Sequence, residues 1–298
     1  MIGLRKIKKR KTASTFAYLT ILPAVLLIIG LGIFPLIYTI YISTHSLHAD
    51  LSIGHYIGLQ NYWKIITDKA FIHSLSLTIY FALISIVVQM ILGLAVSMLL
   101  NQKFKGRGFM RAIVLIPWAV PTIVNANLWG FIYNGNYGLL NRILYAFNLI
   151  EKPVTWLGSA RLAMNMIILA DTWRMLPLYV IMILAALQTI PSSAIEAAEI
   201  DGASPFQKFL SIILPMLKPI LLVVLILRTI QAFKVFDIIY VLTYGGPSNG
   251  TMVVSFYSYY QMFRFLKFDY GSAVAIVVAV ITLVITGLYI KLLKTNDD

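Results

Sequence analysis

Five ionisable side chains interrupt otherwise apolar stretches of the sequence: Asp171, Arg174, Arg228, Lys234 and Asp237. An ionisable group at membrane depth is costly, and it usually faces a cavity or an opposite charge. Asp171 and Arg174 are three residues apart, as are Lys234 and Asp237, so each pair could meet on one helix face. Two interpretations stay open. The charges form two internal ion pairs, with Arg228 needing another explanation, or they line a pathway for a polar solute.

Amide and aromatic side chains accompany these charges, and such a combination suits a sugar. Sugar hydroxyls need hydrogen-bonding partners, and sugar C–H faces pack on flat apolar rings. Any one of these residues is more often a helix-packing residue than a ligand contact, so their concentration in three neighbouring apolar stretches is the informative feature. The candidate pathway residues are Asn125, Asn127, Trp129, Trp173, Arg174, Arg228, Gln231, Phe236 and Tyr240.

Covalent chemistry finds little support in the sequence. No nucleophile–base arrangement stands out, the chain has no cysteine, and no GxxxxGK[ST] loop is present to hold nucleotide phosphates. His45 and His48 are closely spaced, but two solvated loop histidines explain them better than metal ligands do. We therefore expect no enzyme activity and no cofactor bound to this chain.

An acidic, alanine-rich segment at 191–215, which we call the elbow, interrupts the apolar pattern in a different way. It carries Glu196, Glu199 and Asp201 within six positions. Its alanines present little bulk to another protein surface, and its carboxylates offer hydrogen-bond acceptors. From the residues alone, a docking role and an ordinary interfacial loop both remain open.

Local signals in the elbow predict two short helices. Ser193 with Glu196, and Ser204 with Gln207, both have the spacing of a capping box, in which each partner satisfies a free backbone amide at a helix start. Gly202 lies between them and is suited to end the first helix. We expect a helix, a glycine junction and a second helix.

The elements that must position these residues are apolar helices. The chain has 298 residues, 60% hydrophobic and 12% charged, whereas soluble domains average about 25% charged residues. The mean hydropathy is +0.86. No sustained two-residue alternation occurs, so an all-α integral membrane protein with six transmembrane helices is expected rather than a barrel. The apolar runs lie at 16–43, 71–100, 111–133, 161–190, 216–243 and 271–293.

The segments between these runs differ in positive charge. The N-terminal segment, the 101–111 loop, the elbow region and the C-terminus carry fourteen Lys and Arg, against seven in the intervening segments. This bias predicts that both termini and the elbow lie in the cytoplasm. It also accounts for the net charge of +13 without a nucleic-acid partner. Residues 138–150 have helical apolar spacing and form either a short interfacial helix or a packed loop.

The elbow resembles the signature of inner-membrane permeases of binding-protein-dependent ABC importers. That signature is EAA, three residues, Gly, nine residues, Ile, one residue and Leu-Pro, and every fixed position and gap agrees. In the family this segment is the coupling helix, which seats in a cleft of a cytoplasmic ATPase subunit. The resemblance implies a coupling role for Glu196, Ala197, Ala198, Asp201, Gly202, Ala203, Leu214 and Pro215.

The resemblance extends over most of the chain and favours the carbohydrate (MalF-like) branch. The segments WAVPTIVNA (118–126) and FKVFDIIYVLT (233–243) are most similar to the corresponding segments of trehalose/maltose-type permeases. The extra N-terminal spans and large periplasmic insertion of the biggest members are lacking. The resemblance implies the type-1 importer permease fold, with 1–70 as basic tail, first span and outer loop, 71–293 as a five-helix core and 294–298 as a cytoplasmic tail.

The resemblance also implies the partners and the activity. An ABC ATPase dimer binds ATP and Mg²⁺ in the cytoplasm, a second and related permease chain completes the pathway, and an extracytoplasmic sugar-binding protein delivers substrate. We expect a multi-pass cell-membrane subunit that imports a sugar, a disaccharide such as trehalose or maltose. Glycerol phosphate or another small solute is the alternative cargo. An ion-coupled secondary transporter using Asp171 or Asp237 is a more distant alternative.

Overall fold

The computed structural model describes residues 18–47 and 52–293, which are mainly helical. The basic tail expected before residue 18, His48 and the expected tail at 294–298 lie outside this part. Its helices and strands are η1 (Ile29–Ile33), α2 (Phe34–Ser43), β1 (His45–Leu47), β2 (Ile53–Tyr56), α3 (Gln60–Thr67), α4 (Lys69–Asn101), α5 (Arg107–Ala119), α6 (Thr122–Ile132), α7 (Leu139–Ala146), α8 (Ala160–Leu187), α9 (Ser192–Ile200), α10 (Pro205–Lys208), η2 (Phe209–Ile213), α11 (Leu214–Phe233), α12 (Asp237–Leu242), α13 (Val254–Phe263) and α14 (Phe268–Leu293).

Five helices of the described chain are long and apolar enough to cross a membrane. They are Tyr18–Ser43, Lys69–Asn101, Ala160–Leu187, Pro205–Phe233 and Phe268–Lys291. A sixth span exists only if α5 and α6 are counted together, because they meet at 96°. Pro121 disfavours helical backbone at Val120, which is extended with φ −76° and ψ 125°, and the helix therefore breaks there. The expected straight third span is thus a bent pair.

The expected fifth span, 216–243, is also interrupted. One helical run already begins at Pro205 and ends at Phe233, and α12 begins only at Asp237. Lys234 directly follows the last residue of α11 and is not helical, with φ −97° and ψ 3°. Lys234 and Asp237 are therefore not on one helix face. The ion pair that their spacing would allow within a single helix is not formed, so that interpretation is wrong.

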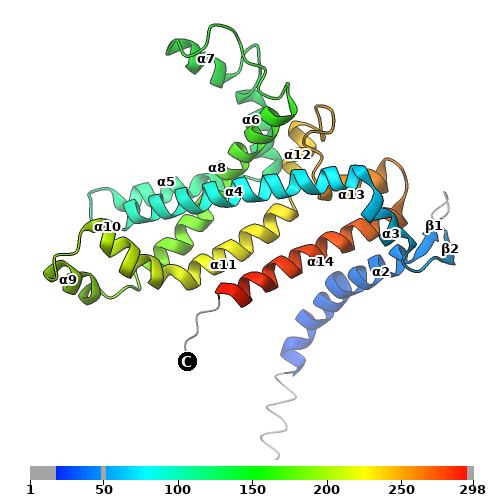
Figure 1. Ribbon diagram of the computed structural model, residues 1–298, viewed down its shortest axis with the longest axis horizontal. Helices are drawn as coiled ribbons and strands as arrows, with labels where there is room; N and C mark the ends of the chain where they lie inside the picture. The colour runs from blue at the N-terminus through cyan, green and yellow to red at the C-terminus, as the bar shows by residue number, and fades with distance from the viewer. Residues whose placement is uncertain (1–17, 48–51, 294–298) are drawn as a thin grey trace, which may run out of the picture.

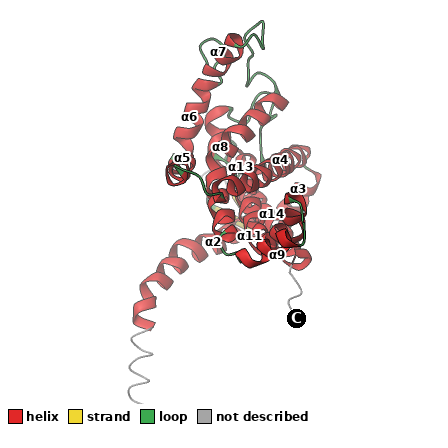
Figure 2. Ribbon diagram, turned by 90° about the vertical axis from the view of Figure 1, so that its left-hand side faces the viewer, coloured by secondary structure: helices red, strands yellow, loops and turns green. Residues whose placement is uncertain are grey.

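Figure 1 shows α4, α8, α11 and α14 side by side, with the elbow at one end of this bundle and the β1–β2 hairpin at the other. The helix α4 packs on α8, and α11 packs on both α4 and α14. The arm formed by α6 and α7 and the first span both lead away from the bundle (Figure 2). The expected polar loop at 44–70 contains the hairpin and α3, and the amphipathic segment 138–150 does form the helix α7.

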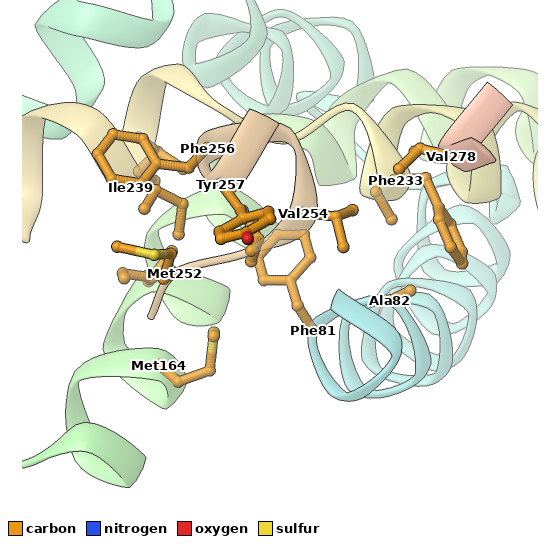
Figure 3. Close-up of a cluster of buried hydrophobic side chains, with 14 of the residues drawn as sticks. Phe81, Ala82, Met164, Phe233, Ile239, Met252, Val254, Phe256, Tyr257 and Val278 are labelled. Carbon is orange, nitrogen blue, oxygen red and sulfur yellow. The ribbon is translucent and has the colours of Figure 1, made fainter. Parts of the chain in front are cut away.

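The main apolar core lies toward the hairpin end of the bundle, where α13 packs on α4 and α14 and α12 packs on α6 and α8. Figure 3 shows part of this core. Phe81 of α4, Ile239 of α12 and Phe256 of α13 are all fully buried in it. Lipid is as apolar as these side chains, so close packing rather than exclusion of water stabilises such a core. This core includes Phe233 and Ile238, which lie on either side of the gap between α11 and α12, so it fixes the position of that gap.

Asp68 joins three helices at this end. Its Oδ1 accepts the amide of Ala70 at 2.9 Å and so caps α4, while its Oδ2 accepts the hydroxyls of Tyr257 in α13 and Tyr270 in α14. Partial burial alone raises the pKa of Asp68, but the two hydroxyls and the amides of Ala70 and Phe71 outweigh it, so this pKa lies below its ordinary value of 3.8.

We expect Asp68→Asn to lower the free energy of unfolding by about 1–3 kcal/mol at neutral pH, since it removes charge-assisted bonds and weakens a cap. Because the folded pKa is lowered, the Asp68 contribution is complete above the ordinary pKa of 3.8 and is lost as pH falls through the folded pKa. Thermal unfolding in detergent across a pH series measures both effects. The matched control is Glu151→Gln at an exposed carboxylate. A deficit that persists unchanged at the lowest pH would contradict the assignment.

Candidate functional site

A polar cavity of about 280 Å³ lies where the two helix breaks meet α8. Trp118 and Thr122 flank the bend between α5 and α6, and Lys234 and Asp237 flank the gap between α11 and α12. Backbone that is not helical is tolerated at membrane depth only where it is covered by protein or lines a cavity. The full lining comprises Trp118, Thr122, Asp171, Arg174, Met175, Arg228, Gln231, Lys234, Val235, Phe236, Asp237 and Ile238.

A buried ion pair forms one wall of this cavity. Arg228 Nη2 of α11 donates to Asp171 Oδ2 of α8 at 2.7 Å, and the two residues are only 2% and 5% exposed. The Arg228 guanidinium also lies 5.5 Å from the centre of the Phe81 ring. Gln89 of α4 donates to Thr172 Oγ1 at 3.3 Å and to Asp171 at 3.5 Å. The pair therefore links α4, α8 and α11.

The predicted pair of Asp171 with Arg174 is wrong. Residues three apart share one side of α8, but Asp171 faces α11, where Arg228 gives it a closer partner. Arg174 lines the cavity and takes part in neither of the ion pairs found among residues 18–47 and 52–293. Arg228, the charge that lacked a partner in the sequence, is thus the one that is paired.

The structure brings together four of the nine candidate pathway residues: Arg174, Arg228, Gln231 and Phe236. Tyr240 lies just outside, with its ring 5.6 Å from that of Phe236.

The other four candidates lie outside the cavity lining. Asn125 is buried and donates to the Ala170 carbonyl at 3.3 Å. Asn127 is exposed and donates to the Ile123 carbonyl at 3.0 Å, within its own helix. The rings of Trp129 and Trp173 pair with each other at 6.0 Å.

Sequence reasoning missed Trp118 and Thr122, whose position follows from the bend at Pro121, and it missed the polar groups that support the cavity. Tyr179 is fully buried and its hydroxyl donates to Gln231 Oε1 at 2.7 Å, which orients that amide. Gln89 is 1% exposed. Gln89 is the one amide side chain in the apolar run 71–100, and a buried amide needs hydrogen-bonding partners. Its presence was therefore the signal from which a polar contact between helices could have been predicted.

The elbow consists of two short helices joined at Gly202, as its sequence predicts. Gly202 has φ +76°, a left-handed conformation that favours glycine. Its amide donates to the Glu199 carbonyl at 3.1 Å, and the Ala203 amide donates to the Ala198 carbonyl at 2.9 Å. These two bonds form a Schellman motif, which satisfies the last carbonyls of α9.

One of the two predicted capping boxes is present. Ser204 and Gln207 exchange both bonds, at 2.8 and 3.3 Å, and cap α10. The box of Ser193 with Glu196 is wrong, because α9 begins at Ser192 after Pro191 and no side chain caps it. Ser193 therefore lies inside the first turn, and Glu196 is exposed without serving as a cap.

The surface of the elbow combines exposed apolar and charged side chains. Ile200 is 86% exposed and Phe206 is 69% exposed. Lys208 Nζ binds Glu199 Oε1 at 2.6 Å and ties α10 to α9. The other candidate coupling residues lie along this segment: Ala197, Ala198 and Asp201 near the end of α9, Ala203 after Gly202, and Leu214 and Pro215 at the start of α11.

Apolar spans, two broken helices around a polar cavity and a protruding helical elbow define a membrane transport protein rather than an enzyme. The chain belongs to the family of binding-protein-dependent transport system inner membrane components, whose family model matches residues 89–293. It is a multi-pass membrane protein and a transport subunit, not an enzyme.

Relatives match along nearly the full chain. The trehalose/maltose transport system permease protein MalF of Thermococcus litoralis is 43% identical, over 98% of each chain. The sulfoquinovosyl glycerol transport system permease protein SmoG of Agrobacterium fabrum is 33% identical, over 94% of this chain and 91% of the relative. A chain of a bacterial alginate ABC transporter, solved in complex with an alginate pentasaccharide-bound periplasmic protein, shares the fold with a TM-score of 0.82 at 22% identity, over 94% of both chains.

We expect Asp171→Ala to lower the free energy of unfolding by about 3–5 kcal/mol, because it leaves the buried Arg228 without a counter-charge. The double variant Asp171→Leu with Arg228→Met replaces the pair by apolar groups and recovers most of that loss. Unfolding midpoints of the detergent-solubilised chain measure both. Arg174→Met, at an unpaired cavity residue, is the control and changes the midpoint little. A double variant as unstable as Asp171→Ala would contradict the cross-helix pair.

Proposed function

We propose that this chain is the permease subunit of an ATP-driven importer for a sugar, a disaccharide such as trehalose or maltose, and forms half of the translocation pathway. The observation that carries the proposal is the polar cavity at the two helix breaks. The names of the relatives in Thermococcus and Agrobacterium support a carbohydrate cargo.

The cavity has the groups that a sugar needs. Gln231, Arg174 and Lys234 donate hydrogen bonds, Asp237 accepts them, and the ring of Phe236 offers a flat apolar face. Its volume of about 280 Å³ lies just below the usual range for small-molecule sites. A cavity of this size suits one half of a site, which a second and related permease chain completes.

A second candidate cargo is a small anionic solute such as glycerol phosphate. Three cationic residues, Arg174, Arg228 and Lys234, line the cavity against two carboxylates, Asp171 and Asp237. One positive charge is therefore left over, which favours a phosphate or sulfonate group on the cargo.

The elbow couples this chain to a cytoplasmic ATPase dimer, which binds the ATP and Mg²⁺. Ile200 and Phe206 supply apolar contacts and Glu196 supplies an acceptor that no cap consumes. Gly202 sets the angle between α9 and α10 through its left-handed backbone. The bias in Lys and Arg supports a cytoplasmic position for the elbow and for both termini, with an extracytoplasmic sugar-binding protein delivering cargo at the opposite end.

We expect Phe206→Ala to lower sugar-stimulated ATPase activity and uptake at least about tenfold, because a well-packed aromatic anchor is often worth 2 kcal/mol or more at an interface. Phe206 is 69% exposed in the isolated chain, so its loss leaves the fold intact. Phe147→Ala is the matched control, since Phe147 is 72% exposed at the end of α7, on the arm that leads away from the bundle (Figure 2). If an assembled complex carrying Phe206→Ala keeps wild-type ATPase stimulation and uptake, the docking role is wrong.

A single cysteine at Gln231 tests the pathway, and the absence of native cysteine makes the background clean. We expect a charged, water-soluble thiol reagent to label it in a manner that depends on nucleotide, with protection by the transported sugar. Protection by glycerol phosphate instead identifies the second candidate cargo. Leu283, 70% exposed in α14, is the lipid-facing control and stays unlabelled. A cysteine at Gln231 that is inaccessible in every state rules out the pathway role.

A further inference from the structure

A second and larger cavity, of about 620 Å³, lies at the end of the bundle away from the elbow. It is open to the surface and bordered by β1, α3, the start of α4, α13 and the start of α14, and its polar lining includes Lys64, Gln261 and Lys267. Two membrane-spanning helices, Lys69–Asn101 and Phe268–Lys291, begin at its wall. The cavity therefore lies at the depth where the hydrocarbon of the membrane meets the headgroups.

The surface around this cavity is apolar and aromatic. Leu59, Trp63 and Ile66 are 70%, 73% and 65% exposed, and their spacing places them on one face of α3. Phe265 and Leu266, in the turn before α14, are each 54% exposed. A short helix with exposed Trp and aliphatic side chains beside lysine is typical of a segment that lies in the membrane interface.

Two cations in this cavity lack an ion-pair partner among the described residues, although Lys267 Nζ lies 5.9 Å from the centre of the Phe265 ring. Lys64 and Lys267 take part in neither of the ion pairs of the described chain. Asp68 is already bonded by two tyrosine hydroxyls and an amide, and Asp269 Oδ2 accepts from Asn61 at 3.4 Å. Both carboxylates also line the cavity, but neither forms an ion pair with Lys64 or Lys267, so the amino groups remain available to an anion.

We propose that this cavity binds the phosphate of a membrane phospholipid, with Lys64 and Lys267 as its cationic contacts. The acyl chains of that lipid pack against the apolar face of α3. The bound lipid thereby holds together the starts of two spans that Asp68 already links. This inference does not depend on the transported solute.

The test uses the full-length chain in neutral detergent, titrated with phosphatidylglycerol. The readouts are the thermal unfolding midpoint and the number of bound lipids by native mass spectrometry. We expect phosphatidylglycerol to raise the midpoint of the wild type, and the double variant K64Q/K267Q to bind it roughly thirtyfold more weakly. R142Q/K152Q, which removes the same charge from exposed positions outside the cavity, binds as the wild type does.

Two further arms separate the sources of phosphate. A galactosyl diacylglycerol, which lacks phosphate, and inorganic phosphate alone both leave the midpoint unchanged if the site is for a phospholipid. Equal stabilisation by either one overturns the proposal, as does undiminished phosphatidylglycerol binding by K64Q/K267Q. The variant K64R/K267R keeps both charges and retains lipid binding. Midpoints measured without lipid check that all variants are folded.

Discussion

The contact between Asp171 and Arg228 is the interaction on which the interior of this protein depends. Two full charges at 2.7 Å, almost completely removed from solvent, tie α8 to α11 at the level of the helix breaks. Each charge is tolerable there only because the other is present. The aromatic ring of Phe81 and the amide of Gln89 complete the surroundings, so three helices are held in one register by a single polar cluster.

The breaks between α5 and α6 and between α11 and α12 border the same cavity as that polar cluster. A continuous helix satisfies its own backbone and can face lipid, whereas an interrupted one needs protein around it. In this chain the core beside the α11–α12 gap is built by α4, α8, α11, α12, α13 and α14. The hairpin end is consequently a scaffold, and the elbow end is left with exposed side chains such as Ile200 and Phe206.

The sequence predicts the apolar spans, the fold class and the glycine junction of the elbow, because each depends on local composition or on a single backbone conformation. It does not predict the partner of Arg228, since pairing between helices depends on their packing register and not on spacing within either one. The predicted box of Ser193 is wrong because α9 begins at Ser192, two residues before the start that a cap at Ser193 requires. The bends were visible only as Pro121 and as charges at 234–237 within runs that are otherwise long enough to span.

The continuity of the segment Pro205–Phe233 has a mechanical consequence. Arg228 and the exposed ring of Phe206 are carried by the same helical rod, and the 23 residues from Pro205 to Arg228 span about 35 Å at the rise of an α-helix. Tilting such a rod by about 10° at the elbow displaces its far end by about 6 Å. That displacement exceeds the 2.7 Å contact with Asp171, so a small rotation of this segment about its elbow end is geometrically sufficient to separate the two charges.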